Sequence, residues 1–247
     1  MPEGPSIAIL REQAAGFVGK TIVRAHGNNK TVDMDNLVGQ KVVAVRSWGK
    51  HFLLQLSTVA LRIHLMMFGS YRINEHKDVP PRLGLEFEDG EEFNFYTCSV
   101  RPIDANLDAQ YDWRVDVMSD RWDAKWVRAQ LRALPPDTLV CDALLTQSVF
   151  SGVGNIIKNE VLFRIRVHPL STVGALPAPK LRELVDQARQ YSFDFLEWKK
   201  AFVLKAHWLA HTKRICPRCD IPFSKGHLGK THRRSFFCEK CQKLYAD

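Results

Sequence analysis

The decapeptide Ser151-Gly-Val-Gly-Asn155-Ile-Ile-Lys-Asn-Glu160 is the stretch from which the organisation of this 247-residue chain can be worked out. Its two glycines permit a tight turn and a close backbone approach, and the apolar pattern after them predicts a helix. The first N–H groups of a helix suit a phosphate. Asn155 could cap this helix or act as a direct donor. Alone, the pattern also fits an ordinary turn between helices.

The residues on both sides of this stretch predict further helices. The segment 123–134 is amphipathic and stops at Pro135-Pro136, and Asp137-Thr138 can cap another helix through Leu145. Helices are also predicted over 155–163 and 178–196. This half of the chain is therefore expected to be helical.

The first 115 residues have a different character. Pro5 can start a short helix that ends near Gly16. Short β-rich runs follow, separated by turn signals such as Asn28-Asn29 and Asp89-Gly90. The runs are 21–25, 41–46, 52–56, 60–65, 83–87 and 93–96. They predict an antiparallel β-sandwich or barrel.

Two Cys-x-x-Cys pairs predict one structural zinc ion near the end of the chain. The ligands would be Cys216, Cys219, Cys238 and Cys241. Two such pairs at this separation favour zinc over a redox pair, and a hairpin between them would bring four thiolates together. Four protein ligands leave no open position, so this metal is not expected to be catalytic. Cys98 and Cys141 stand alone and are interpreted as core residues.

The positive charge of the chain is concentrated in the same region. Of the 35 Lys and Arg residues, 12 lie in residues 199–247, together with only three acids. The other residues contain 23 basic and 24 acidic side chains. A basic, glycine-punctuated segment between the two cysteine pairs, residues 225–234, fits a phosphate backbone. A solvated surface, or a zinc ribbon that binds protein, is the alternative.

The composition predicts a soluble intracellular protein of the cytoplasm or nucleoid. No apolar run approaches the roughly 18 residues of a membrane span, and the first residues lack the basic and apolar regions of a secretory signal. The six cysteines are therefore interpreted as thiols or metal ligands.

Five motifs in this order resemble those of the formamidopyrimidine-DNA glycosylase and endonuclease VIII family. The resemblance extends over nearly the whole chain, and Gly4 resembles the endonuclease VIII branch. The motifs are residues 1–5, 48–54, 64–69, 151–160 and the cysteine module.

The resemblance implies an α+β multidomain fold. It places a catalytic β-sandwich, preceded by a helix, in residues 1–115. A helix–two-turns–helix DNA-binding domain would follow in 120–210, and a zinc-finger hairpin in 211–247. The implied activity is that of a base-excision-repair DNA glycosylase and AP lyase, a monomer acting on damaged DNA, double- or single-stranded.

The resemblance also assigns catalytic roles to three residues. Removal of Met1 would expose the secondary amine of Pro2, and because α-amino groups titrate near pH 8, a useful fraction is unprotonated at neutral pH. This amine would attack C1′ of the damaged nucleotide and form a Schiff base. Glu3 would be the general acid/base, and Lys50 would hold a flanking phosphate. Without the resemblance, Pro2 and Glu3 are simply the residues that precede the first predicted helix, and Lys50 is a surface lysine.

Four further residues match DNA-binding positions of the family. Met67 would fill the gap left by an extruded nucleotide, although a strand here would bury at least one residue of 66–68 in the core. Arg233 matches the hairpin arginine that contacts phosphates, with Arg234 as the alternative if the register is shifted. Asn155 would contact the same phosphates.

The match departs from the family pattern at several points. Ser6 stands where the family usually has a glutamate, which puts in doubt how the base or sugar is recognised. The formamidopyrimidine branch's Arg–Phe pair is missing near Arg101, and the segment between Phe195 and Cys216 is short. With Gly4, these points favour oxidised pyrimidines as substrates. A non-catalytic reader of damaged or abasic DNA on the same scaffold is the alternative, and a zinc-ribbon transcription factor a more distant one.

Overall fold

A computed structural model describes residues 2–246 of the protein, and these form two compact units. One unit consists of Pro2 and Ser6–Tyr111, and the other of Glu3–Pro5 and the chain from Asp112 onward. The folding of residues 211–247 as a separate domain stays a prediction. None of the described helices is both long enough and apolar enough to cross a membrane.

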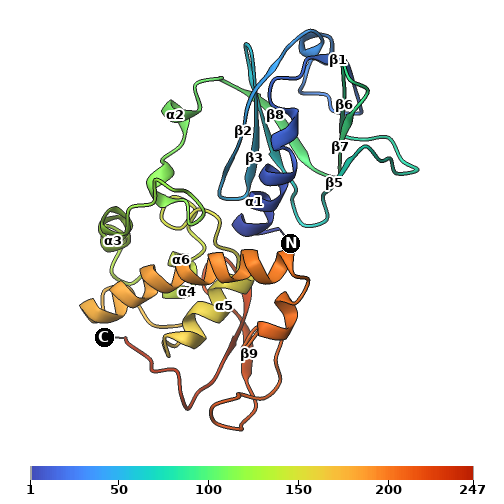
Figure 1. Ribbon diagram of the computed structural model, residues 1–247. Coiled ribbons are helices and arrows are strands. Elements are labelled where there is room, and N and C mark those ends of the chain that lie inside the picture. The colour runs from blue at the N-terminus through green and yellow to red at the C-terminus, as the bar shows by residue number, and fades with distance from the viewer. Residues whose placement is uncertain (1, 247) are drawn as a thin grey trace. The chain divides into compact units, whose positions relative to one another are not determined.

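The first unit is a sandwich of two four-stranded antiparallel sheets (Figure 1). The strand orders are β1-β6-β7-β5 and β2-β3-β4-β8. The elements from the start of the chain to this unit's end are α1 (Gly4–Gln13), η1 (Ala15–Phe17), β1 (Ile22–His26), η2 (Asp35–Leu37), β2 (Val42–Trp48), β3 (His51–Leu56), β4 (Ala60–His64), β5 (Ser70–Ile73), β6 (Leu83–Phe87), β7 (Glu92–Tyr96), β8 (Ser99–Ile103) and α2 (Leu107–Gln110). The predicted helix and sandwich are confirmed.

Two strands of the sandwich, β5 and β8, are absent from the sequence prediction. Both lie at the edge of a sheet. All four residues of β5 are only partly buried, so the strand lacks a clear alternation. In β8, Pro102 weakens the strand pattern, because proline removes a ladder donor and is confined to edges.

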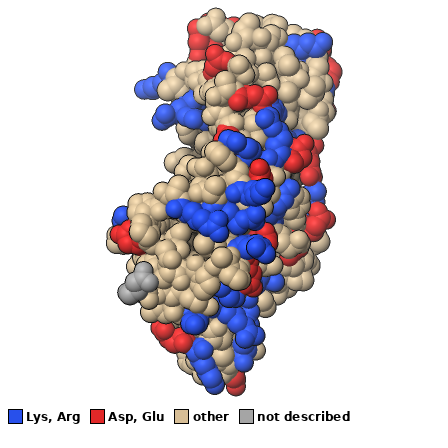
Figure 2. Space-filling model, turned by 90° about the vertical axis from the view of Figure 1, so that its left-hand side faces the viewer, with Lys and Arg blue, Asp and Glu red and all other residues tan. Residues whose placement is uncertain are grey.

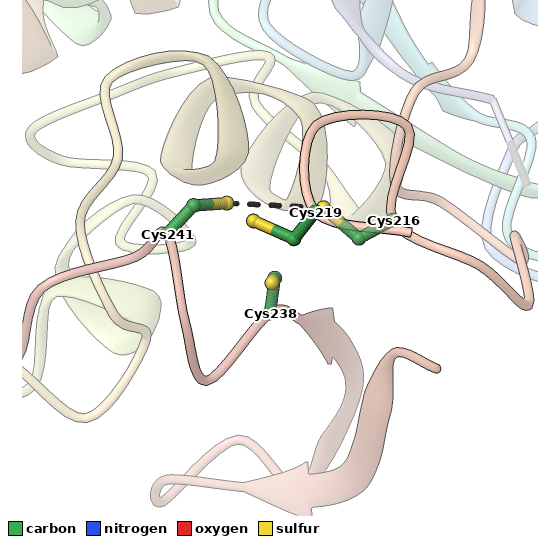
Figure 3. Close-up of side chains that lie close together, drawn as sticks. All are labelled: Cys216, Cys219, Cys238 and Cys241. Atoms are coloured by element: carbon green, nitrogen blue, oxygen red, sulfur yellow. Dashed lines mark hydrogen bonds between the residues drawn. The ribbon is translucent and has the colours of Figure 1, made fainter. Parts of the chain in front are cut away.

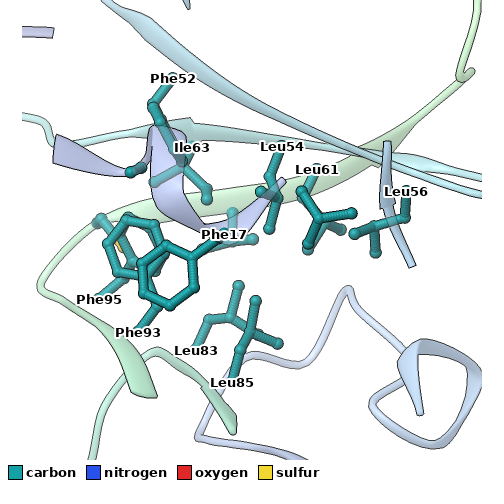
Figure 4. Close-up of a cluster of buried hydrophobic side chains, with 14 of the residues drawn as sticks. Phe17, Phe52, Leu54, Leu56, Leu61, Ile63, Leu83, Leu85, Phe93 and Phe95 are labelled. Carbon is teal, nitrogen blue, oxygen red and sulfur yellow. The ribbon is translucent and has the colours of Figure 1, made fainter. Parts of the chain in front are cut away.

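The core of the first unit lies between its two sheets. Phe52 projects from one sheet, Phe93 and Phe95 from the other, and Phe17 from η1. The rings of Phe17 and Phe93 are stacked with centroids 5.0 Å apart, and those of Phe93 and Phe95 lie 4.3 Å apart (Figure 4). Phe93 also lies against the rings of Phe52 on β3 and Tyr71 on β5, so it joins η1 to both sheets.

The second unit is mainly helical and ends in a two-stranded hairpin. Its elements are η3 (Trp113–Val115), α3 (Ala124–Arg132), α4 (Val140–Ala143), α5 (Asn155–Arg164), α6 (Ala178–Lys200), η4 (Leu204–His207), β9 (Ser224–Leu228) and β10 (Arg233–Phe237). Helix α5 packs against both α6 and β10. The hairpin predicted between the cysteine pairs is therefore present.

The start of α3 is set by a local capping residue, whereas the start of α4 is set by pairing with a distant segment. Asp123, the first residue of the predicted amphipathic segment, is the N-cap of α3 and accepts hydrogen bonds from the backbone N–H groups of Lys125 and Trp126. The helix expected after Asp137-Thr138 through Leu145 is wrong in extent, because α4 spans only Val140–Ala143. The backbone before it pairs instead with residues 171–173, where Val140 N–H donates to the Ser171 carbonyl at 2.8 Å.

Truncation of Phe93 tests the aromatic core. Phe93→Ala should lower the free energy of unfolding by about 3–5 kcal/mol, because it removes a fully buried ring and leaves a cavity. Val23→Ala, on the exposed side of β1, should change it by less than about 0.5 kcal/mol. Urea unfolding measures both. Equal losses in the two variants would contradict this description of the core.

Candidate functional site

Glu3 binds the N-terminal end of helix α5 and is almost completely buried, with 1% of its surface exposed. Its carboxylate accepts hydrogen bonds from the backbone N–H groups of Gly154, Ile156 and Ile157, at 3.1, 2.8 and 3.2 Å. A helix N-terminus carries a partial positive charge of about half a unit, which stabilises an anion there. The residue that follows Pro2 is thus fixed to the glycine-containing turn.

Each glycine of this turn has its own reason, a positive φ at Gly152 and a close approach at Gly154. Gly152 has φ of 96°, and its carbonyl accepts a 2.8 Å hydrogen bond from Gly4 N–H. A Cβ on Gly154 would lie 2.4–2.6 Å from the atoms of the Glu3 carboxyl group. The turn therefore leaves just enough room for Glu3.

Asn155 is not the N-cap of α5, which corrects one of the two roles expected for it. Gly154 occupies the cap position, and Glu3 supplies the carboxylate that binds the helix N–H groups. The Asn155 side chain instead donates to the Arg234 carbonyl at 3.0 Å. Since Glu3 occupies three of the first N–H groups, side chains must supply most of any phosphate site here.

Three side chains of α5 converge on strand β10. Besides Asn155, the amide of Asn159 and the ammonium of Lys158 donate to the Arg234 carbonyl, at 3.2 and 3.3 Å. Lys158 also donates to Ser235 Oγ at 2.8 Å, and Asn159 Oδ1 accepts from Phe236 N–H at 3.1 Å. Helix α5 therefore fixes the position of the strand that carries the two hairpin arginines.

Lys158 is an unusual group at this junction because it is 1% exposed. Burial lowers the pKa of Lys158 to about 8, since the charged form loses its hydration, and the Arg233 guanidinium also lowers it. The nearby Cys141 thiol, Asp142 and Glu3 act in the opposite direction. The buried ammonium is thus held by these groups together with its two oxygen partners on β10.

Arg233 and Arg234 project from opposite faces of β10, because side chains alternate along a strand. Arg233 shares its face with Ser235, the residue bound by Lys158. Arg234 shares its face with Phe236, and its guanidinium lies 5.3 Å from the centre of that ring. On this second face Arg234 lines a pocket of about 440 Å³ together with Lys213, Arg214 and Lys225.

Two buried carboxylates hold the ends of the hairpin module in place. Asp142 accepts hydrogen bonds from Lys230 N–H, Thr231 N–H and the Thr231 hydroxyl, at 2.8, 3.1 and 2.9 Å. Glu160, fully buried, accepts from the backbone N–H groups of residues 209–211 at 2.8–3.1 Å. The tip of the hairpin and the segment leading to it are both attached to the helical part of the unit.

In the first unit, Lys50 lies at the tip of the β2–β3 hairpin. Trp48 pairs with His51, so Gly49 and Lys50 form a two-residue turn, and Gly49 has φ of 54°. A positive φ at this position favours glycine. The neighbouring His51 has its pKa lowered to about 4, mainly by burial, and that of His64 is also lowered. Both imidazoles are neutral at pH 7 beside Lys50.

The residues around Met67 form a tight exposed loop rather than the end of a strand. Gly69 N–H donates to the Leu65 carbonyl at 2.7 Å, and Met66 has φ of 52°. Met66, Met67 and Phe68 are 51%, 49% and 79% exposed. The expectation that at least one of the three is a core residue is therefore wrong.

The four cysteines of the two pairs come together as predicted. Their Sγ atoms all lie within 4.8 Å of one another, and those of Cys216 and Cys241 are 3.8 Å apart (Figure 3). Four sulfurs around one tetrahedral zinc, with Zn–S bonds of about 2.3 Å, would lie roughly 3.8 Å apart. This cluster can bind a metal ion. Cys98 and Cys141 are buried as predicted, and burial raises the pKa of each thiol to about 11.

Positive side chains gather at the end of the second unit that carries the hairpin. Figure 2 shows blue side chains predominating at the lower end of the view, where Figure 1 places β9. This distribution agrees with the concentration of Lys and Arg in residues 199–247. The hairpin region presents a surface suited to a polyanion.

Several residues of this arrangement are missing from the sequence prediction, namely Lys158, Asn159, Glu160 and Asp142. Their signal is present, however, in the apolar runs that surround them. Asp142 lies within Val-Cys-Asp-Ala-Leu-Leu, and Lys158–Glu160 lie between the apolar runs Ile-Ile and Val-Leu-Phe of one helix. A charged residue in such a run must be partnered when it is buried.

Substitution of Gly154 tests the fit of Glu3 against the turn. Gly154→Ala should lower the free energy of unfolding by about 1–3 kcal/mol, because its Cβ would overlap the Glu3 carboxyl group. Gly16→Ala is the matched control, since a Cβ there meets nothing within 4 Å. Chemical denaturation measures both. If both variants are as stable as the wild type, Glu3 does not occupy this position.

The burial of Lys158 predicts a pH dependence of stability. Its pKa is about 8 in the folded protein and about 10.5 in an unfolded chain. Between these values the unfolded state binds more protons, so the Lys158 contribution to stability rises with pH. The free energy of unfolding of the wild type, relative to that of Lys158→Met, should therefore rise by up to about 1.4 kcal/mol per pH unit over this range.

Urea unfolding between pH 7 and pH 10.5 checks the Lys158 prediction. Lys125→Met, at an exposed position on α3, is the control and should show no such trend. A wild-type advantage over Lys158→Met that stays constant with pH would contradict a lowered pKa.

Two family models match the chain. The formamidopyrimidine-DNA glycosylase N-terminal domain matches residues 1–98, and the H2TH domain of the same family matches residues 115–197. The chain is 32% identical to endonuclease 8 2 of Mycobacterium bovis, over 76% of the chain and 77% of that protein. It is 35% identical to bovine endonuclease 8-like 2, over 76% of the chain.

The chain spans 60% of the length of bovine endonuclease 8-like 2 and 38–40% of two endonuclease 8-like 3 proteins. A solved structure of Lactococcus lactis Fpg in complex with DNA containing an oxidised pyrimidine has the same fold, with a TM-score of 0.83 at 20% identity. The match covers 98% of the chain and all of that protein. The chain therefore belongs to the formamidopyrimidine-DNA glycosylase and endonuclease VIII family, in its endonuclease VIII-like branch.

Proposed function

We propose that the protein is a DNA glycosylase and AP lyase of base-excision repair that removes oxidised bases, with oxidised pyrimidines as the favoured class. The observation that carries this proposal is the position of Glu3. Its carboxylate is bound to the N-terminal end of α5 while the adjoining residue, Pro2, bears the amine. An acid/base group and a nucleophile are thus next to each other at one fixed point.

The reaction begins with attack of the Pro2 amine on C1′ of the damaged nucleotide. The C1′–N bond to the base breaks, and the base leaves with a proton. Opening of the sugar ring then gives a Schiff base between Pro2 and C1′. Loss of a C2′ proton and of the 3′ phosphate is the β-elimination, and loss of the C4′ proton and of the 5′ phosphate is the δ-elimination. Water finally hydrolyses the Schiff base.

Glu3 exchanges protons with the sugar during these steps. Three N–H donors hold its carboxylate in one position, so the oxygens need little reorganisation as the reaction proceeds. The amine requires loss of Met1, a residue that lies outside the described part of the chain. A preparation that retains Met1 should bind DNA without reacting.

The DNA is held by groups of both units. In the second unit, Asn155 and Arg233 contact the phosphates around the extruded nucleotide, with Lys158 positioning the strand that carries Arg233. Arg234 projects from the other face of β10 and is the weaker candidate for this role. In the first unit, Lys50 holds a flanking phosphate.

Met67 fills the space that the extruded nucleotide leaves. Its side chain is half exposed on a tight loop, as an apolar wedge requires. Extrusion costs a few kcal/mol, and an inserted apolar side chain offsets part of this cost.

The cysteine cluster is proposed to hold one zinc ion. The sulfur separations fit tetrahedral coordination, and thiolates are preferred zinc ligands. Bound zinc would stabilise the hairpin on which Arg233 lies, because a module this small buries little apolar surface. The ion takes no part in the chemical step, since four thiolates complete its coordination.

The support from relatives concerns substrate and reaction class. Lactococcus lactis Fpg has been solved with DNA containing an oxidised pyrimidine and with DNA containing an abasic site. An abasic site is the product of base removal and the substrate of the lyase step.

Borohydride trapping on an abasic-site oligonucleotide tests the proposed reaction. The processed protein, starting at Pro2, should form a covalent adduct, because borohydride reduces a Schiff base to a stable amine. Pro2→Gly removes the secondary amine and should trap less. Binding of the same DNA without any adduct would overturn the enzymatic proposal and favour a non-catalytic reader.

Salt dependence tests the opposite orientation of the two hairpin arginines. Affinity for abasic-site duplex DNA should fall steeply as salt rises, and Arg233→Ala should reduce the slope of log K against log salt by about 1. Arg234→Ala is the matched control, because it removes the same charge from the other face. Fluorescence anisotropy titrations give both slopes. Equal effects of the two substitutions would contradict the assignment of Arg233.

A further inference from the structure

Phe202 is the most exposed large hydrophobic residue among those that the structure describes, with 96% of its surface accessible. It follows helix α6 (orange in Figure 1) immediately after the C-cap residue Ala201. Its side chain gains almost nothing from burial, so packing within the unit does not explain the ring.

The backbone of Phe202 adds a second cost. Its φ is 61°, in the left-handed region that glycine normally occupies at a helix end. Phe202 N–H donates to the Lys199 carbonyl at 3.1 Å, and Val203 N–H donates to the Trp198 carbonyl at 2.9 Å. These two hydrogen bonds define a Schellman motif, in which glycine would be free of strain. A bulky strained residue at such a position indicates selection for something other than folding.

The bend that carries Phe202 is held in place from both sides. Beyond it, His207 of η4 stacks on Trp198 of α6, with ring centroids 4.2 Å apart and planes within 2° of parallel. The two hydrogen bonds fix the backbone between these rings. The phenyl ring is therefore presented by an ordered bend, which lowers the entropy that binding must overcome.

The surroundings of Phe202 are basic. Lys199 and Lys200 occupy the last turn of α6, and Lys205 lies in η4. No acidic residue occurs in the sequence between Glu197 and Asp220. An exposed aromatic ring among lysines fits a nucleic-acid strand, since the ring can stack on a base while the ammonium groups contact phosphates. The same charges disfavour a basic partner.

We propose that Phe202 stacks on an unstacked base of the bound DNA, so that the end of α6 is a base-binding subsite. This inference rests on the proposed function in one respect only, namely that the protein binds DNA. A base within a continuous duplex has both faces covered, so the subsite requires a base beside a gap, an extruded nucleotide or a single strand. Phe202 would thus favour DNA that carries unpaired bases.

An abasic scan tests this proposal. Single-stranded oligonucleotides with an abasic analogue at the reactive position receive one further abasic spacer at each flanking position in turn. The spacer removes a base and keeps the phosphate. A spacer at one of these positions should lower the affinity of the wild-type protein for the oligonucleotide about 5- to 100-fold, the range expected for one base–aromatic stack.

Four substitutions at Phe202 distinguish stacking from other contacts. Phe202→Trp and Phe202→Tyr should keep the loss at that position, because both retain an aromatic face. Phe202→Gly and Phe202→Leu should abolish this loss of affinity, because neither has an aromatic face. Leucine keeps an apolar surface, so it separates stacking from a general apolar contact. If Leu performs as well as Trp, or if the scan of Phe202→Gly matches the wild type, the proposal is overturned.

Thermal unfolding gives an independent measurement. Phe202→Gly should raise the melting temperature by about 2–4 °C, because glycine relieves the left-handed strain. A lower melting temperature would show that the ring supports the fold, and would overturn the proposal. Borohydride trapping is measured in parallel. Failure of trapping in every variant, the wild type included, rejects the proposed reaction, whereas the abasic scan and the melting temperature decide the role of Phe202.

Discussion

The binding of the Glu3 carboxylate to the N-terminal end of α5 is the interaction on which the functional arrangement depends. It joins residues 151 to 154 positions apart in the sequence and fixes the backbone next to Pro2. Glycine at 154 is required because any Cβ would overlap the carboxyl group. The same three N–H groups are thereby unavailable to a phosphate, so side chains would have to supply most of the donors of the proposed phosphate site.

Helix α5 carries this constraint onward to the hairpin. Within the first half of the helix, the side chains of Asn155, Lys158 and Asn159 reach β10. Glu160, the next residue, binds the segment that leads to the cysteine cluster. Asp142 binds the hairpin tip from α4. A single helix thus sets the positions of Glu3, the proposed acid/base residue, at one end and of the strand proposed to bind phosphates beside it. Burial of the Lys158 ammonium is the energetic cost of this junction, and oxygen partners on β10 offset it.

Features governed by local sequence could be predicted, and those governed by distant partners could not. The cysteine spacing, the amphipathic pattern of α3 and the six stronger strands depend on neighbouring residues. The edge strands β5 and β8 have weak patterns, because edges need less apolar surface. Asn155 had the local preference for an N-cap, but a carboxylate brought in by the fold displaced it. The orientations of Arg233 and Arg234 became clear only from the partners of Ser235 and Phe236.

Amide hydrogen exchange tests the central claim most directly, namely that Glu3 holds the start of α5. In the wild type, the N–H groups of Ile156 and Ile157 should exchange slowly, because each donates to the buried carboxylate. In Glu3→Ala these two amides should lose protection, while the amide of Val161 within α5 keeps most of its own. Equal protection of Ile156 and Ile157 in both proteins would contradict the account.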